Sequence, residues 1–292
     1  QELKLTRDII KVASVRDQNG RGEYPLDENK IGYARLRQFG EQTSAELEGA
    51  LAKMEKAGVK GFIMDLRDNP GGLLDQAVKV SEKFLPRGQL VVSTEARQIA
   101  DIAKYTASGR NSRPQLPMVI LVNGGSASAS EIVAGCLQDL KRAVVLGEQT
   151  FGKGSVQTII PLGQNNGALR LTTARYYTPS GRSIQAKGIV PDVWLDETAE
   201  GNVFAALRMR EADLEKHLSG SDEKTIRERE RVRAEERKKV EEQLAKAKDL
   251  KPLPEFGSAE DFPLQQALNQ LRGKPVLVSK TATERKAEAP KP

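Results

Sequence analysis

The apolar residues of this chain recur with two different periods, and the alternation of the two marks out an ordered series of elements. Compact apolar runs bounded by turn residues predict buried strands, and apolar residues three or four positions apart predict amphipathic helices. Such elements alternate along the middle of the chain, with strands expected at 30–39, 59–67, 117–123 and 143–148 and helices at 43–58, 73–85 and 128–141. This alternation is typical of a layered α/β core whose sheet is partly parallel.

The pattern changes after residue 154. The runs "SVQTIIPL" (155–162) and "ALRLTTARYY" (168–177) flank "GQNNG", which predicts a β-hairpin instead of another strand–helix unit. Further on, "EKTIRERERVRAEERKKVEEQLAKAKD" predicts a charged helix, and "DFPLQQALNQLRG" predicts an amphipathic helix that docks on the core or on a second subunit. We therefore expect a segment ahead of the core (1–29), the core (30–199), a helical region (200–272) and a disordered tail (273–292).

Composition excludes several classes of function. No apolar run is long enough to span a membrane. The net charge of +6 arises from 46 basic residues mixed with 40 acidic ones, and no basic run is interleaved with aromatic residues, so we expect no nucleic-acid partner. The single cysteine, Cys136, and the single histidine, His217, exclude multi-thiolate and multi-histidine metal sites. We expect neither a metal nor a cofactor, a buried thiol at Cys136 and a surface position for His217.

The stretch "GEQTFGKGSVQ" (147–157) resembles a phosphate-binding loop but departs from it in two respects. That loop requires Ser or Thr directly after its lysine, and it must open a helix. Here Gly154 follows Lys153, and the next residues predict a strand. We conclude that Lys153 does not hold a nucleotide phosphate. Two interpretations of Lys153 remain open: it is a solvent-facing lysine in a turn, or flanking glycines bring it to a functional site.

Two other turns offer chemistry at the ends of predicted strands. In "NGGSASASEIVAG", Ser128 and Glu131 have the spacing of a capping box, and a serine at the start of a helix is also suited to act as a nucleophile. In "DLRDNPGG", Gly71 and Gly72 could present a backbone N–H group to an oxyanion, or could simply form a turn.

Since no histidine lies near these motifs, a serine nucleophile would need another base, and a neutral lysine can serve. An ordinary lysine has a pKa of about 10.4, so a lysine base must be shifted by about 3 pKa units, equivalent to about 4 kcal/mol, mostly through burial.

Three segments together resemble one family. "KGFIMDLRDNPGGLL", "VILVNGGSASASEIVAGCLQD" and "VVLGEQTFGKGSVQ" strongly resemble the carboxyl-terminal processing proteases, also called tail-specific proteases. The resemblance is close over about residues 30–195 and implies an α/β core related to the crotonase and ClpP folds, with an added hairpin and C-terminal helices. It also implies a serine endopeptidase that cleaves proteins near their C-termini through an acyl-enzyme.

Carried over to this chain, the resemblance implies Ser128 as nucleophile and Lys153 as general base. Gln157 matches the glutamine that orients the lysine. The oxyanion donors would be the N–H group of Ala129 and that of Gly71 or Gly72, a choice that the sequence leaves open.

Members of this family normally carry a PDZ domain ahead of the core, and residues 3–15 resemble the segment that leaves it. We expect a fragment or processed form without that domain. The implied partners are polypeptides with apolar C-termini, an adaptor or a second subunit is a candidate partner of the C-terminal helices, and the implied location is the periplasm or cell envelope. Two alternatives remain: an inactive relative that binds a peptide or a lipophilic ligand, and a crotonase-like acyl-CoA enzyme, for which CoA binding is the test.

Overall fold

The computed structural model describes residues 12–96, 102–163, 167–201, 210–214 and 253–280, together with the single residues 231 and 238. Residues 1–11 of the segment expected ahead of the core, His217, most of the charged helix and the last twelve residues lie outside these ranges. The helices are α1 (Thr43–Lys56), α2 (Leu74–Ser81), α3 (Ala129–Asp139) and α5 (Phe262–Leu271), with the 3₁₀ turns η1 (Glu82–Phe84) and η4 (Glu211–Asp213). None of the helices described is long and apolar enough to cross a membrane.

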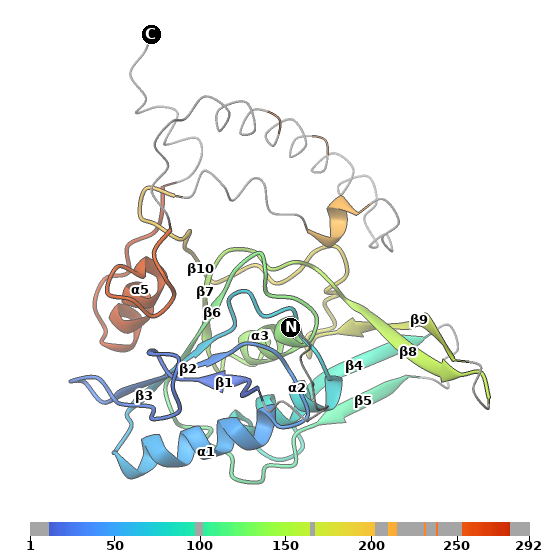
Figure 1. The fold of residues 1–292 in the computed structure, drawn as a ribbon, viewed down its shortest axis with the longest axis horizontal. Coiled ribbons are helices and arrows are strands. Elements are labelled where there is room, and N and C mark those ends of the chain that lie inside the picture. The colour runs from blue at the N-terminus through green and yellow to red at the C-terminus, as the bar shows by residue number, and fades with distance from the viewer. Residues whose placement is uncertain are drawn as a thin grey trace, which may run out of the picture.

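The described strands form two sheets (Figure 1). The larger has the order β1-β2-β3-β6-β7-β10 and consists of β1 (Val15–Arg16), β2 (Ile31–Leu36), β3 (Gly61–Asp65), β6 (Met118–Val122), β7 (Val144–Gly147) and β10 (Val193–Trp194). All its pairs are parallel except β1 with β2. The predicted α/β class and the partly parallel sheet are confirmed.

The smaller sheet has the order β5-β4-β9-β8, with β4 (Leu90–Ala96), β5 (Ala103–Thr106), β8 (Ser155–Pro161) and β9 (Ala168–Tyr177). The predicted hairpin is confirmed as the antiparallel pair β8–β9, which extends away from the rest of the molecule in Figure 1. The sequence pattern did not reveal β4 and β5. A register shift between Leu90 and Val92 interrupts the alternation that identifies a half-buried strand.

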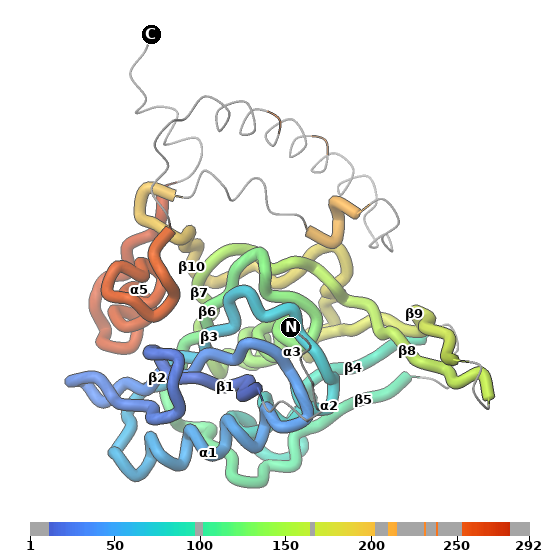
Figure 2. Tube along the Cα trace, viewed as in Figure 1, coloured from blue at the N-terminus to red at the C-terminus, as the bar shows by residue number. Residues whose placement is uncertain are grey.

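Helices cover both faces of the larger sheet, because alternate residues of its strands point to opposite faces. Ala34, Met64 and Ile120 face one way and belong to the larger apolar core, which α1, α2 and α3 cover. Tyr33, Ile63 and Leu121 belong to a second cluster that includes Leu264 and Ala267 of α5. Figure 2 shows α5 beside this sheet, away from α1. The C-terminal helix therefore docks on the core of its own chain.

Residues 274–280, which the sequence assigned to the tail, contact the core in the structure. Ser279 is buried, and its hydroxyl donates a hydrogen bond to the carbonyl oxygen of Thr198. The segment that follows α5 thus returns from the helix to residues 196–199.

Candidate functional site

Ser128 lies in the turn between β6 and α3, at the N-cap of the helix. Its φ of 53° and ψ of −112° place it in a conformation that residues other than glycine rarely adopt. The N–H group of Ala127 donates to the carbonyl oxygen of Asn69, which holds the turn against the neighbouring loop. A strained serine at the start of a helix, next to the end of a buried strand, is the geometry of a nucleophile elbow.

Glu131 is fully buried in the first turn of α3, and its carboxylate accepts four hydrogen bonds. Oε2 accepts from the backbone N–H groups of Ser128 (2.8 Å) and Lys153 (2.9 Å). Oε1 accepts from the N–H group of Gly152 (2.7 Å) and from the hydroxyl of Thr150 (2.5 Å). The sequence predicted only the bond within the helix. Glu131 also joins the Ser128 turn to the Lys153 loop, and the S-x-x-E spacing alone carries no signal for that second contact.

Burial raises the pKa of the Glu131 carboxyl to about 7, although its four hydrogen bonds act in the opposite direction. The carboxyl therefore titrates near neutral pH in the folded protein. Its ionised form is the one that can accept all four bonds, because a protonated carboxyl must itself donate one.

Lys153 is half-buried in the loop that crosses from β7 in one sheet to β8 in the other. The glycines on either side of it are needed for close packing against residues 184–188. Gly152 has a φ of 100°, and a Cβ atom at Gly154 would lie 2.3 Å from the backbone nitrogen of Gln185. The loop continues into a strand, not into a helix, so the structure agrees with the rejection of a phosphate-binding loop.

The structure brings Ser128 and Lys153 to the same carboxylate oxygen, but no hydrogen bond between their side chains is found among the described residues. Gln157 is exposed on β8, and the described contacts include none between it and Lys153. The strand has a register shift between Val156 and Gln157, which turns the side chains that follow relative to those that precede it.

The 68–72 loop, which follows β3, lies directly against Ser128. A Cβ atom at Gly71 would be 2.8 Å from Cβ of Ser128 and 2.8 Å from the backbone nitrogen of Ala129. The N–H group of Gly71 donates to Oδ1 of Asn69 (2.9 Å), so it is already engaged within the loop. At Gly72, whose φ is 146°, a Cβ atom would be 2.2 Å from the carbonyl oxygen of Phe39. Both positions therefore require glycine.

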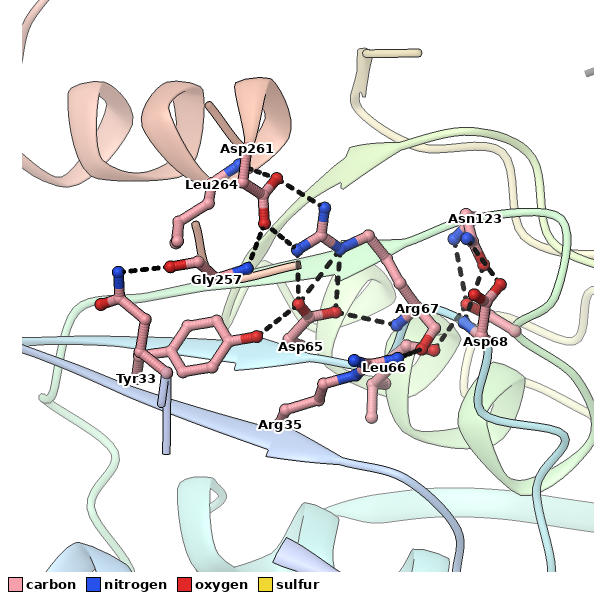
Figure 3. A network of polar contacts seen from close by, with 12 residues as sticks. Tyr33, Arg35, Asp65, Leu66, Arg67, Asp68, Asn123, Gly257, Asp261 and Leu264 are labelled. Atoms are coloured by element: carbon pink, nitrogen blue, oxygen red, sulfur yellow. Dashed lines mark hydrogen bonds and ion pairs between the residues drawn. The ribbon is translucent and has the colours of Figure 1, made fainter. Parts of the chain in front are cut away.

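A buried ion cluster lies at the start of this loop and was not predicted from the sequence (Figure 3). The guanidinium of Arg67 is 2% exposed and pairs with Asp65 and Asp261, each at 2.6 Å. Burial would lower the pKa of Arg67, but the two carboxylates raise it well above its usual value. Burial would likewise raise the pKa of Asp65, but Arg67 and the Tyr33 hydroxyl hold it below its usual value.

Neither the single cysteine nor the acidic residues of the described chain form a further candidate site. Cys136 is fully buried in α3, as predicted, and burial raises the pKa of its thiol. Within the part of the chain that the structure describes, no group of three or more His, Cys, Asp or Glu residues is arranged to hold a metal ion.

Residues 30–195, more than half of the chain, match the peptidase family S41. The chain belongs to peptidase family S41. The matched segment begins just before β2, ends just after β10, and contains Ser128, Lys153 and the 68–72 loop. The family assignment predicted from the three sequence segments is thereby confirmed.

This S41 chain is 48% identical over 227 residues to the carboxy-terminal-processing protease of Bartonella bacilliformis, covering 76% of this chain and 50% of the relative. It is 43% identical over 167 residues to the chloroplastic C-terminal processing peptidase of Tetradesmus obliquus, covering 57% of this chain and 35% of the relative. A solved photosystem II D1 C-terminal processing protease matches with a TM-score of 0.54 and 37% identity, over 66% of this chain and 50% of that one. The chain thus spans half or less of the length of these relatives.

Proposed function

We propose that this chain carries the catalytic site of a serine endopeptidase that cleaves polypeptides near their C-termini, with Ser128 as nucleophile and Lys153 as general base. The observation that supports it most directly is the anchoring of both backbone N–H groups on Oε2 of Glu131. A strained serine and a lysine in the loop between the two sheets are fixed to one atom, beside a glycine loop. The printed names of the relatives, which are processing proteases, support the same reaction.

The proposed reaction uses groups of this chain alone. Neutral Lys153 Nζ takes the proton of Ser128 Oγ, and Oγ forms a bond to the carbonyl carbon of the scissile peptide. When the tetrahedral intermediate collapses, the peptide C–N bond breaks and Lys153 returns the proton to the leaving amine. Lys153 then takes a proton from water, which attacks the acyl carbon; the ester bond to Ser128 Oγ breaks, Lys153 returns the proton to Oγ, and the second product leaves as a carboxylic acid.

We assign the oxyanion donors to the N–H groups of Ala129 and Gly72. Ala129 occupies the first position of α3, where a backbone N–H group has no partner within the helix and the helix dipole favours negative charge. Gly72 is preferred to Gly71, because the N–H group of Gly71 is engaged by Asn69. Two such donors stabilise the charge that develops in the transition state.

We propose that Gln157 orients Lys153 through a contact that forms when substrate is bound. The proposed substrates are polypeptides that bind in extended form with apolar residues near the C-terminus. An exported protein, in the periplasm or cell envelope, is proposed from the family resemblance.

Mass spectrometry of an unfolded model protein after incubation tests the proposal. The wild-type chain should generate internal cleavage products that Ser128→Ala and Lys153→Ala do not, with the circular dichroism spectrum unchanged. Lys56→Ala, which alters an exposed lysine at the end of α1, is the matched control and should cleave normally. Full activity in either site variant would disprove the dyad. A wild-type chain that is inactive but binds acyl-CoA would instead support the crotonase-like alternative.

A further inference from the structure

The carboxylate of Asp261, far along the chain, closes the polar cluster at the start of the 68–72 loop. Arg67 donates to its two oxygens, from Nη1 at 2.8 Å and from Nη2 at 2.6 Å, across a sequence separation of 194 residues. Figure 3 shows the guanidinium between Asp261 on one side and Asp65 on the other. This pairing is bidentate, the geometry in which an arginine–carboxylate pair is strongest and most specific.

Arg67 depends on this contact because its charge is shielded from water. The guanidinium is 2% exposed, and the Phe256 ring lies over it at 4.1 Å. Phe256 precedes α5, as Asp261 does, so both contacts come from the C-terminal segment. A buried charge that loses one of its partners is strongly destabilised in place. Without Asp261, the guanidinium would have to move toward water and draw its backbone with it.

The backbone at Arg67 leads directly into the loop beside the nucleophile. Asn69 links the two, since its carbonyl oxygen accepts from the N–H group of Ala127 at 3.0 Å and from the hydroxyl of Ser130 at 2.9 Å. Its side chain fixes the loop internally by accepting from the N–H group of Gly71. A shift of the Arg67 backbone would therefore displace Asp68 and Asn69, and with them the loop backbone that contacts Ser128.

We propose that Asp261, acting through Arg67, is a positioning residue for the 68–72 loop, so that the C-terminal segment holds the oxyanion side of the site in place. Asp261 does not touch the reacting atoms. The effect of Asp261 on catalysis rests on the function proposed above, whereas its effect on the position of the 68–72 loop does not.

The structure offers a variant that separates this contact from the second role of Asp261. Its side chain also caps α5, because Oδ1 accepts from the N–H group of Leu264 (3.2 Å), and Oδ2 accepts from the N–H group of Gly257 (2.7 Å) in the preceding loop. Asparagine is as good an N-cap as aspartate, so Asp261→Asn can keep the cap on Leu264 while it removes the charge that Arg67 requires; the bond from Gly257 is lost with the second oxygen. Phe256→Leu is a second variant, which removes the ring but keeps the carboxylate.

Arg272→Gln is the matched control. Arg272 pairs with Asp27 at 2.6 Å and also ties the α5 segment to the core, but at the opposite end of the helix from the Arg67 cluster. Loss of this pair should loosen the docking of α5 without reaching the loop.

Hydrogen–deuterium exchange at the amides of Asp68, Asn69 and Gly71 tests the contact, together with steady-state kinetics on a peptide substrate. In Asp261→Asn we expect these amides to exchange at least about tenfold faster and kcat to fall about tenfold to a hundredfold, with KM changed less than about twofold. Phe256→Leu should shift exchange in the same direction by less, and Arg272→Gln should change neither exchange in the loop nor kcat.

The proposal is overturned if the three amides exchange in folded Asp261→Asn as they do in the wild type, or if Arg272→Gln accelerates them equally. If Asp261→Asn does not fold, unchanged exchange in Phe256→Leu overturns it. The exchange measurement does not depend on proteolysis. An inactive wild-type chain would thus count against the proposed function alone, and unchanged exchange in an active enzyme against this inference alone.

Discussion

Ser128 and Lys153 donate their backbone N–H groups to one oxygen atom, Oε2 of Glu131, at 2.8 and 2.9 Å. One buried atom thereby holds both the strained turn of the proposed nucleophile and the loop of the proposed base. Because the carboxylate is fully buried, a replacement side chain of the same size that cannot accept both bonds leaves an N–H group unpaired away from water. The first two predictions follow from this arrangement.

Replacing Glu131 by Gln should lower kcat about a hundredfold or more and leave KM nearly unchanged. The amide of Gln has one oxygen and one NH₂ group. In either orientation of that amide, one pair of donors would therefore face another donor: either the N–H groups of Ser128 and Lys153, or the Thr150 hydroxyl and the Gly152 N–H group. Misplacement of a catalytic group by about 1 Å can cost a factor of this size. The measurement is steady-state kinetics on a peptide substrate.

Asp192→Asn is the control for this prediction. Asp192 also accepts a backbone N–H group, that of Val145 at 2.8 Å, but it lies at the far end of α3 from Ser128. Equal losses of kcat in both variants would show that general destabilisation, and not the anchoring of the proposed dyad, is responsible.

The stability that Glu131 confers should depend on pH with a definite sign. Its pKa is about 7 in the folded protein against a usual 4.5, so the folded state retains the proton more strongly than the unfolded state. The free energy of unfolding of the wild type, relative to that of Glu131→Gln, should therefore fall by about 3 kcal/mol as the pH rises from about 4 to about 8, and become constant above that. Urea titrations of both proteins across this range measure it. A difference that stays constant or rises with pH contradicts the raised pKa.

Replacing Gly71 by Ala should abolish proteolysis, whereas Gly88→Ala should not. Both glycines have positive φ angles, 95° and 83°, so both substitutions should cost stability, about 1 kcal/mol from conformation alone. Only at Gly71 would the new Cβ atom lie within 2.8 Å of Ser128 and Ala129, since nothing lies within 4 Å of the corresponding atom at Gly88. Cleavage assays and thermal melts of the two variants make the comparison, and comparable activity in both would show that the 68–72 loop is not part of the site.

Thiol reagents should leave the native protein both unmodified and active. Cys136 is fully buried, and its raised pKa leaves almost no thiolate, the form that reacts with iodoacetamide. Intact-mass measurement should show no adduct in buffer and one adduct in concentrated urea. Rapid alkylation of the folded protein, with parallel loss of cleavage, would point to a cysteine nucleophile instead.

The order of elements in the core was predictable from the sequence, because apolar periodicity is a local property that each strand or helix expresses by itself. The hairpin β8–β9 and the strands β3 and β6 were found in this way. Strand β4 was missed, since a bulge interrupts the alternation on which such a prediction depends, and β5 was missed because it is short and none of its four residues is buried. The candidate residues Ser128 and Lys153 came from the absence of a usable histidine and from the family resemblance.

Only the tertiary structure decided which residues hold these candidates in place. The sequence pattern identifies Glu131 as part of a helix cap. The Lys153 N–H group that it also binds lies 22 residues further along the chain. Arg67 and Asp261 are 194 residues apart, and no local pattern pairs them. The proposal of Gly72 over Gly71 as oxyanion donor rests on the position of the Asn69 side chain, which accepts from the N–H group of Gly71. Local periodicity encodes strands and helices, but hydrogen bonds between buried groups form only where packing brings distant segments together and excludes the water that would otherwise satisfy them.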